Sequence, residues 1–127
     1  MDYASILVVD DDEMIVYFFK MILDELGYNV LEAFSGEDAI KQATSSQIDL
    51  VILDYKLSDM TGDIVAKQIK EMNPQTSIVF VTGYSDAKEK ILSTNLSHHV
   101  MVKPIKENEL IETVEIAFNE RTIAVSV

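Results

Sequence analysis

The sequence contains no cysteine, which excludes disulfide scaffolds, thiolate metal sites and cysteine nucleophiles. Its four glycines form neither a GxGxxG nor a GxxxxGK pattern, so a nucleotide-binding loop has no support. Basic residues are scarce: 10 lysines and arginines against 22 acidic side chains give a formal net charge of −12. Nucleic acid and anionic membranes would both repel such a chain, so we expect it to bind neither directly.

Long hydrophobic runs and secretion signals are also missing. Lys20 interrupts the apolar stretch Ile15–Leu23, and acidic residues follow it. The 127 residues fit one domain, and 48% apolar residues can fill its core. No internal repeat or low-complexity stretch interrupts the chain. We therefore expect a soluble cytoplasmic domain over residues 1–121, with residues 122–127 as a tail or the start of a linker.

Short apolar runs predict the strands of a sheet. Those that are continuous and rich in β-branched residues, as in parallel strands buried on both faces, are Ile6–Val9, Leu50–Leu53, Ile78–Val81 and Val100–Val102. The stretch Tyr28–Phe34 alternates more strongly and contains Glu32, which is typical of an edge strand.

Helical patterns lie between and after these strands. Apolar residues at helical spacing cover residues 15–26, and Gly27 follows as a cap. Ser35 and Asp38 resemble a capping box for a second helix that runs to about Ser46. Further helices are expected near residues 65–74, 86–92 and 110–121. Five β-α units predict an α/β fold, a doubly wound three-layer sandwich with a parallel five-stranded sheet.

Polar residues follow four of the five predicted strands. Asp10 and Asp11 follow the first strand, Asp54 the third, Thr82 the fourth and Lys103 the fifth. Because ligands of such sheets bind beyond the carboxyl ends of the strands, we expect these side chains to meet at one location. Each residue alone has a simpler structural explanation, such as a solvated helix start. Such separate explanations do not account for polar residues at the ends of four strands at once.

The residue types at this edge favour phosphoryl chemistry. Three carboxylates held close together cannot all stay ionised without a compensating charge, and oxygen ligands with open water positions suit Mg²⁺. A site with Mg²⁺, a lysine and a hydroxyl is suited to stabilise a phosphoryl group while a carboxylate attacks in line. Aspartyl phosphate formation is an established use of a carboxylate nucleophile.

Four segments in order carry a resemblance to the receiver domain of two-component response regulators, including chemotaxis regulators: ILVVDDDE, DLVILDYKLSDMTG, IVFVTGY and VMVKP. The resemblance covers about Ser5 to Arg121 and implies a flavodoxin-like (βα)5 fold with strand order 2-1-3-4-5. It also implies a phosphorylatable switch in a phosphorelay, served by a sensor histidine kinase or a histidine phosphotransfer protein. Such a domain is not a conventional enzyme, since it catalyses only its own phosphorylation and dephosphorylation.

The resemblance implies a Mg²⁺ site built from Asp10, Asp11, Asp54 and the backbone carbonyl of Lys56. In this family Asp11 would contact the ion directly, and Asp10 would help through a water molecule. Asp54 would also be the phosphoacceptor.

Two further side chains would act on the phosphoryl group. By resemblance, Thr82 would bind the group and report phosphorylation by moving, and Lys103 would pair with Asp54 and a phosphoryl oxygen. Pro104 would follow a cis peptide bond.

Several positions depart from the family pattern. Val100 stands three residues before the lysine, where an aromatic switch residue is usual, so the coupling of an aromatic ring to phosphorylation is not expected in its usual form. Ser58 replaces a common proline. Lys56 and Tyr84 occupy two variable positions that tune the phosphoryl lifetime, and neither is well placed to orient water, so we expect slow self-dephosphorylation.

Other features concern surfaces. Met14, Phe18 and Met21 form a helical stripe beside the buried one, and it is either an extended core face or a docking surface for the phosphoryl donor. Residues 86–92 and 100–121 correspond to the face that many receivers use for an output partner or a dimer. His98 and His99 are interpreted as solvated loop residues.

A phosphohydrolase of the haloacid dehalogenase type is the alternative function. It would use Asp10 as the nucleophile, and Asp10 with Asp12 imitates its DxD signature. Against it, Met14 stands where that motif has Thr or Val, no acidic pair follows a late strand, and Asp54 would have no role.

Overall fold

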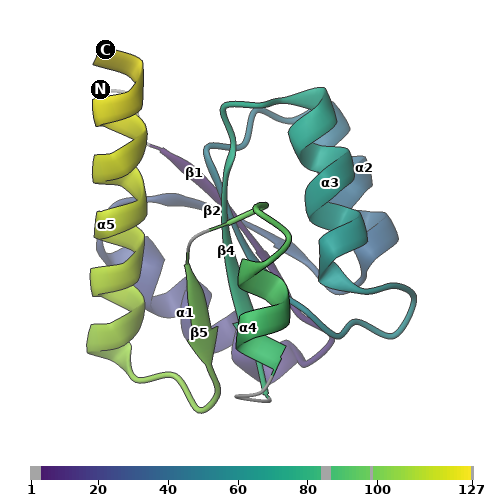
Figure 1. The fold of residues 1–127 in the computed structure, drawn as a ribbon. Helices are drawn as coiled ribbons and strands as arrows, with labels where there is room; N and C mark the ends of the chain where they lie inside the picture. The colour runs from purple at the N-terminus through teal and green to yellow at the C-terminus, as the bar shows by residue number, and fades with distance from the viewer. Residues whose placement is uncertain (1–3, 84–86, 98, 127) are drawn as a thin grey trace.

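The computed structural model describes residues 4–83, 87–97 and 99–126, and it contains five β-α units (Figure 1). The elements in chain order are β1 (Ser5–Val9), α1 (Glu13–Glu25), β2 (Asn29–Ala33), α2 (Gly36–Ser45), β3 (Leu50–Asp54), α3 (Gly62–Met72), β4 (Ser77–Thr82), α4 (Ala87–Leu92), β5 (Val100–Val102) and α5 (Glu107–Ser126). All strand pairs are parallel, and the order is β2-β1-β3-β4-β5. The predicted fold class and strand order are confirmed.

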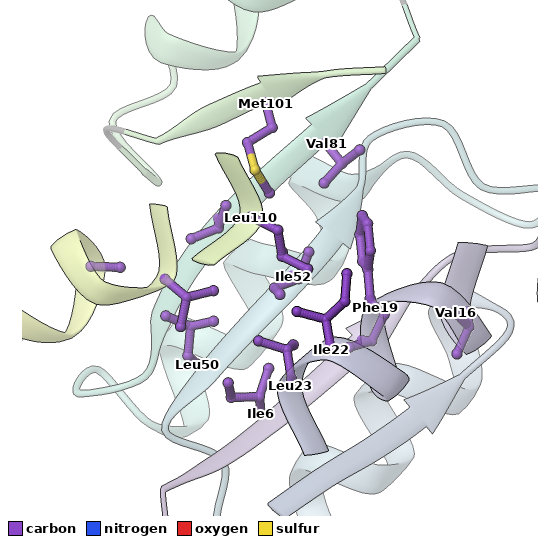
Figure 2. Packing of buried hydrophobic residues seen from close by; sticks show 14 residues of the cluster. Ile6, Val16, Phe19, Ile22, Leu23, Leu50, Ile52, Val81, Met101 and Leu110 are labelled. Atoms are coloured by element: carbon purple, nitrogen blue, oxygen red, sulfur yellow. The ribbon is translucent and has the colours of Figure 1, made fainter. Parts of the chain in front are cut away.

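Consecutive side chains of the central strands enter two different cores, because successive residues of a strand point to opposite faces of the sheet. In β1, Ile6 and Val8 pack with residues of α1 and α5, whereas Leu7 and Val9 pack on the other face with α2, α3 and α4. Figure 2 shows the first of these cores, where Phe19 and Leu110 lie against the sheet. Burial on both faces explains why the strands are continuous apolar runs.

The ends of the first two helices follow the sequence signals. Asp12 caps α1 by accepting a hydrogen bond from the Met14 N–H at 2.9 Å, and Gly27 follows the helix with a φ of 95°. Ser35 caps α2 by accepting from the Asp38 N–H at 3.1 Å. β2 is an edge strand whose residues are mostly half-buried, as predicted.

One helix is longer than predicted. The sequence pattern placed the end of the last helix near Arg121 and left residues 122–127 outside it, but α5 continues to Ser126. No glycine or proline follows Pro104 in the sequence, so nothing in the chain breaks the helix there. Asp86, the expected start of the fourth helix, lies outside the described residues. Among the described residues, no helix is long and apolar enough to cross a membrane.

Gly62 lets α3 begin directly against the end of β3. Its N–H donates to the Tyr55 carbonyl, and a Cβ at this position would lie 2.8 Å from the Asp54 carbonyl oxygen and 2.9 Å from the Tyr55 Cα. These are backbone atoms of the last residue of β3 and of the residue that follows it, so any side chain at 62 would push the end of the strand or the helix away.

We predict that Gly62→Ala lowers the free energy of unfolding by about 1–3 kcal/mol, the usual range for overpacking. Gly83→Ala is the matched control, because a Cβ at Gly83 would meet no atom within 4 Å. Urea denaturation of both variants measures the difference. Equal stability of the two variants would contradict the steric explanation.

Candidate functional site

Strand register brings the predicted site residues to one edge of the sheet. Val9 of β1 pairs with Leu53 of β3, so the next residues, Asp10 and Asp54, are neighbours. On the other side of β3, Asp54 pairs with Val81, the residue before Thr82. Thr82 in turn pairs with the residue before Lys103. The ends of β1, β3, β4 and β5 therefore place a basic, a hydroxyl and two acidic side chains along one edge.

The ammonium group of Lys103 lies between two carboxylates. Its Nζ is 3.0 Å from Oδ2 of Asp10 and 3.4 Å from Oδ2 of Asp54. Asp10 is only 3% exposed and Asp54 only 7% exposed. Burying a carboxylate is costly unless an opposite charge or hydrogen bond compensates it, and here one ammonium compensates two.

The imbalance of charge shifts the pKa values of Asp54 and Lys103. Burial, and then the negative charge of Asp10, raise the pKa of Asp54 from 3.8 to about 6, although Lys103 and the Lys56 backbone N–H oppose the rise. Burial lowers the pKa of Lys103, but its hydrogen bond to Asp10 and the charges of both carboxylates outweigh this and raise it. The lysine stays protonated at neutral pH, and the site retains excess negative charge.

The three consecutive aspartates after β1 have different surroundings. Asp10 is buried, and its Oδ1 accepts from the Asp12 N–H at 2.9 Å. Asp11 is exposed, and Asp12 is the N-cap of α1. In the part of the chain that the structure describes, no three His, Cys, Asp or Glu residues gather closely enough to hold a metal ion. The structure thus joins two of the three predicted carboxylates, and Asp11 lies in the same loop on the surface.

Lys56 and Thr82 complete the predicted set. The backbone N–H of Lys56 donates to the Asp54 carboxylate, while its side chain is exposed. Thr82 is 2% exposed at the end of β4, and its carbonyl accepts from the Lys103 N–H at 2.8 Å. The Lys103–Pro104 peptide bond is cis, as the resemblance implied. Tyr84 lies outside the described residues.

Val100 has no ring that could report phosphorylation. It is half-buried at the start of β5 and packs against the core that contains Phe80 and Ile91. An aliphatic side chain in this position fills space between β5 and its neighbours.

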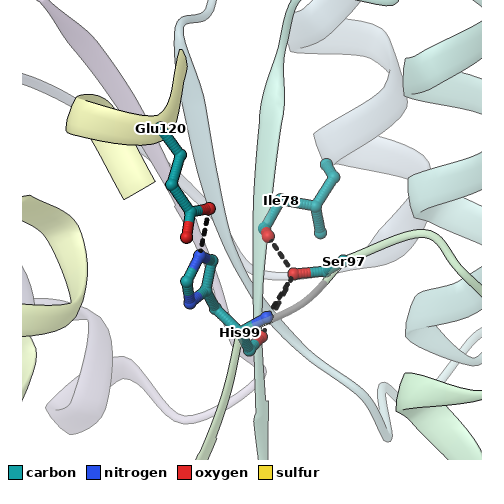
Figure 3. Close-up of polar contacts among 4 residues, drawn as sticks. All are labelled: Ile78, Ser97, His99 and Glu120. Carbon is teal, nitrogen blue, oxygen red and sulfur yellow. Dashed lines mark hydrogen bonds and ion pairs between the residues drawn. The ribbon is translucent and has the colours of Figure 1, made fainter. Parts of the chain in front are cut away.

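The interpretation of His99 as a solvated residue is wrong. The imidazole Nε2 of His99 lies 2.8 Å from Oε2 of Glu120 on α5, and the backbone N–H of His99 donates to the Ser97 hydroxyl at 2.9 Å (Figure 3). Ser97 in turn donates to the Ile78 carbonyl. These contacts hold the chain before β5 against β4 and α5, at the end of β5 away from Lys103. His98 lies outside the described residues.

An apolar groove of about 430 Å³ borders Lys103. Its lining residues come from α1 and from the segment after β5: Met14, Ile15, Phe18, Phe19, Lys103, Pro104 and Ile105. Met14 is 73% exposed and Met21 51%, whereas Phe18 is half-buried against the core. The predicted stripe is therefore an extension of the core at Phe18 and open surface at both methionines.

Sequence patterns did not reveal Asp59, in the loop between β3 and α3. Its carboxylate accepts hydrogen bonds from the Gly36 and Glu37 N–H groups, both at 2.9 Å. The partners lie more than 20 positions apart, so local spacing could not have indicated this contact.

Comparison with known proteins identifies the family. The model of the response regulator receiver domain matches residues 6–115. The transcriptional regulatory protein ZraR of Salmonella typhimurium is 36% identical over 114 residues, which cover 87% of this chain and 25% of ZraR. The chain spans between 12% and 53% of the length of such curated relatives.

Solved structures agree with this result. A CheY-like receiver domain from Methanospirillum hungatei superposes with a TM-score of 0.90 at 27% identity, covering 97% of this chain and 99% of that one. The response regulator TrrA of Thermotoga maritima, in complex with Mg²⁺ and BeF, gives a TM-score of 0.82 at 35% identity, covering 90% and 98%. None of these matches supports the phosphohydrolase alternative. From the family match and the residues at the strand ends, we conclude that this chain belongs to the response regulator receiver domain family.

Proposed function

We propose that the chain is a phosphorylatable switch in a two-component phosphorelay, with Asp54 as the phosphoacceptor. The observation that carries the proposal is the position of the Asp54 carboxylate, at a strand end, 3.4 Å from the Lys103 ammonium and beside Asp10. A carboxylate oxygen of Asp54 would attack the phosphorus of a phosphohistidine while the bond from phosphorus to the imidazole nitrogen breaks.

The surrounding residues support this chemistry. Lys103 can pair with a phosphoryl oxygen, because it already reaches the carboxylate that would carry the group. Thr82 is at the end of the neighbouring strand and would contribute its hydroxyl. The reaction changes only the domain itself, so the domain acts as a switch whose own catalysis is limited to its phosphorylation and dephosphorylation.

The same edge fits Mg²⁺. Two buried carboxylates share one ammonium, so a further cation would relieve the excess negative charge, and the available donors are oxygens. Asp10, Asp54 and the Lys56 carbonyl would hold the ion, and Asp11 would complete the set by turning inward from its exposed position in the loop after β1. Mg²⁺ would neutralise charge on the transferring phosphoryl group. The Mg²⁺ in the complex of TrrA supports this assignment.

The apolar groove beside Lys103 is the proposed docking surface for the phosphoryl donor. A helix of a sensor histidine kinase or a histidine phosphotransfer protein could lay its apolar face against Met14 and Phe18. The phosphohistidine would then approach Asp54 from the side where Lys103 lies. We further propose that α4, β5 and α5 form the contact surface for an output partner or a second copy of the chain. The proposed domain covers residues 1–121, and we expect it to act in the cytoplasm.

Mass spectrometry after treatment with Mg²⁺ and acetyl phosphate tests the acceptor. The wild-type chain should gain one phosphoryl group, because Asp54 is the carboxylate poised next to Lys103, and Asp54→Ala should gain none. Asp10→Asn should still be modified at Asp54, although more slowly. Phosphate on Asp10 of the wild type, or an equal gain by Asp54→Ala, would contradict the proposal.

The raised pKa of Asp54 predicts a dependence of stability on pH. A carboxyl whose pKa rises from 3.8 to about 6 on folding costs nothing below pH 3.8 and its full penalty above pH 6. Without Mg²⁺, Asp54→Asn should therefore raise the free energy of unfolding by about 1–3 kcal/mol at pH 7.5, and by less at pH 5.

Urea denaturation in EDTA at the two pH values measures this effect. Adding Mg²⁺ should narrow the gap, because the ion stabilises the wild-type site. A gain in stability that is as large at pH 5 as at pH 7.5 would show that charge at Asp54 is not its cause.

Docking in the groove predicts a loss that depends on the donor. Phe18→Glu and Met14→Glu should slow phosphoryl transfer from a protein donor about tenfold or more, since a charge would enter an apolar contact. Transfer from acetyl phosphate should change little. Met72→Glu, at a side chain 46% exposed on α3, is the control. Equal losses with both donors would remove the docking assignment.

A further inference from the structure

Asp59 joins the loop after the phosphoacceptor to another helix. Its Oδ1 accepts from the Gly36 N–H and its Oδ2 from the Glu37 N–H, both at 2.9 Å. The first N–H groups of a helix have no partner within the helix, and a carboxylate there is also favoured by the helix dipole. These hydrogen bonds lower the pKa of Asp59, so the carboxylate is ionised at neutral pH.

A second, apolar contact lies next to the first. The side chain of Met60 covers Gly36, where a Cβ would lie 2.5 Å from the Met60 Cγ. Two consecutive residues of the loop, one polar and one apolar, therefore rest on the first turn of α2.

Hydrogen bonds connect this contact to the phosphoacceptor. The Leu57 N–H donates to the Met60 carbonyl at 3.3 Å, and Lys56 forms a β-bridge with Thr61, so the loop closes on itself. At its base, the Lys56 N–H donates to the Asp54 carboxylate.

Apart from these backbone contacts, the loop has few side-chain restraints of its own. Ser58 leaves the loop without a proline, and Thr61 makes no side-chain capping hydrogen bond to α3. Leu57 is buried and anchors one side. The contact with α2 is the polar anchor of the other side.

We propose that Asp59 is a positioning residue: by tying the loop to α2, it holds the backbone of Lys56 in place against Asp54 and the metal site. The chemical consequence rests on the proposed function, since the Lys56 backbone would contribute both the N–H bound to Asp54 and the carbonyl for Mg²⁺. Asp59 would then influence phosphorylation and Mg²⁺ binding through the backbone of Lys56, without itself binding the phosphoryl group or the ion.

A simple helix cap is the competing explanation, and the chain offers a matched control for it. Ser35→Ala removes the other cap of α2, the hydrogen bond from the Asp38 N–H, without touching the loop. Both Ser35→Ala and Asp59→Ala should lower Tm by several degrees, because each removes capping from the same helix. Only Asp59→Ala should disturb Lys56.

The experiment follows the Lys56 amide by NMR and titrates Mg²⁺ into the full chain. In Asp59→Ala the Lys56 amide proton should exchange faster and shift upfield, and the Kd for Mg²⁺ should rise about tenfold, as for residues that orient metal ligands. Ser35→Ala should leave both unchanged within about twofold. Asp59→Asn, which keeps one acceptor oxygen and serves if the alanine variant does not fold, should be intermediate.

The rate of phosphorylation by acetyl phosphate should fall in the same order as Mg²⁺ affinity. The proposal is overturned if Asp59→Ala leaves the Lys56 amide and the Kd unchanged, or if Ser35→Ala changes them equally. A wild-type chain that binds Mg²⁺ but gains no phosphate on Asp54 refutes the proposed function instead. The Lys56 amide and the Mg²⁺ titration still decide the role of Asp59 in that case.

Discussion

The site depends on the two ion pairs that the ammonium group of Lys103 forms with the buried carboxylates of Asp10 and Asp54. Two carboxylates at adjacent strand ends would repel each other, and their burial makes the repulsion worse. One lysine from β5 compensates them in part and leaves the pKa of Asp54 raised to about 6. This incomplete compensation is why we propose that the edge binds a further cation and that Lys103 pairs with a phosphoryl oxygen.

The parallel sheet makes this arrangement possible. All strands run in the same direction, so the residues that follow β1, β3, β4 and β5 lie at one edge of the sheet, although up to 93 positions separate them in the chain. Both faces of the strands are covered by helices, so the strands themselves are apolar and polar chemistry is confined to their ends. The fold therefore separates the residues that give stability from those that react.

Different contacts hold the loops in place at the two ends of the sheet. Near Asp54, Gly62 allows α3 to start close to the strand, and Asp59 ties the intervening loop to α2. At the opposite end of β5, the pair of His99 and Glu120 joins the strand to α5. Val100, at the start of the same strand, packs against the core that contains Phe80 and Ile91.

The sequence by itself determined the five β-α units, the residues at the strand ends and the cap at Ser35, because these depend on periodicity and on neighbours within a few positions. The family resemblance, not the periodicity, supplied the strand order and the roles of the site residues. Only the tertiary structure decided that Asp10 is buried and Asp11 exposed, that His99 is paired, and that Asp59 reaches α2. Those outcomes depend on which side chains meet across distant segments, and burial then sets the cost of each charge.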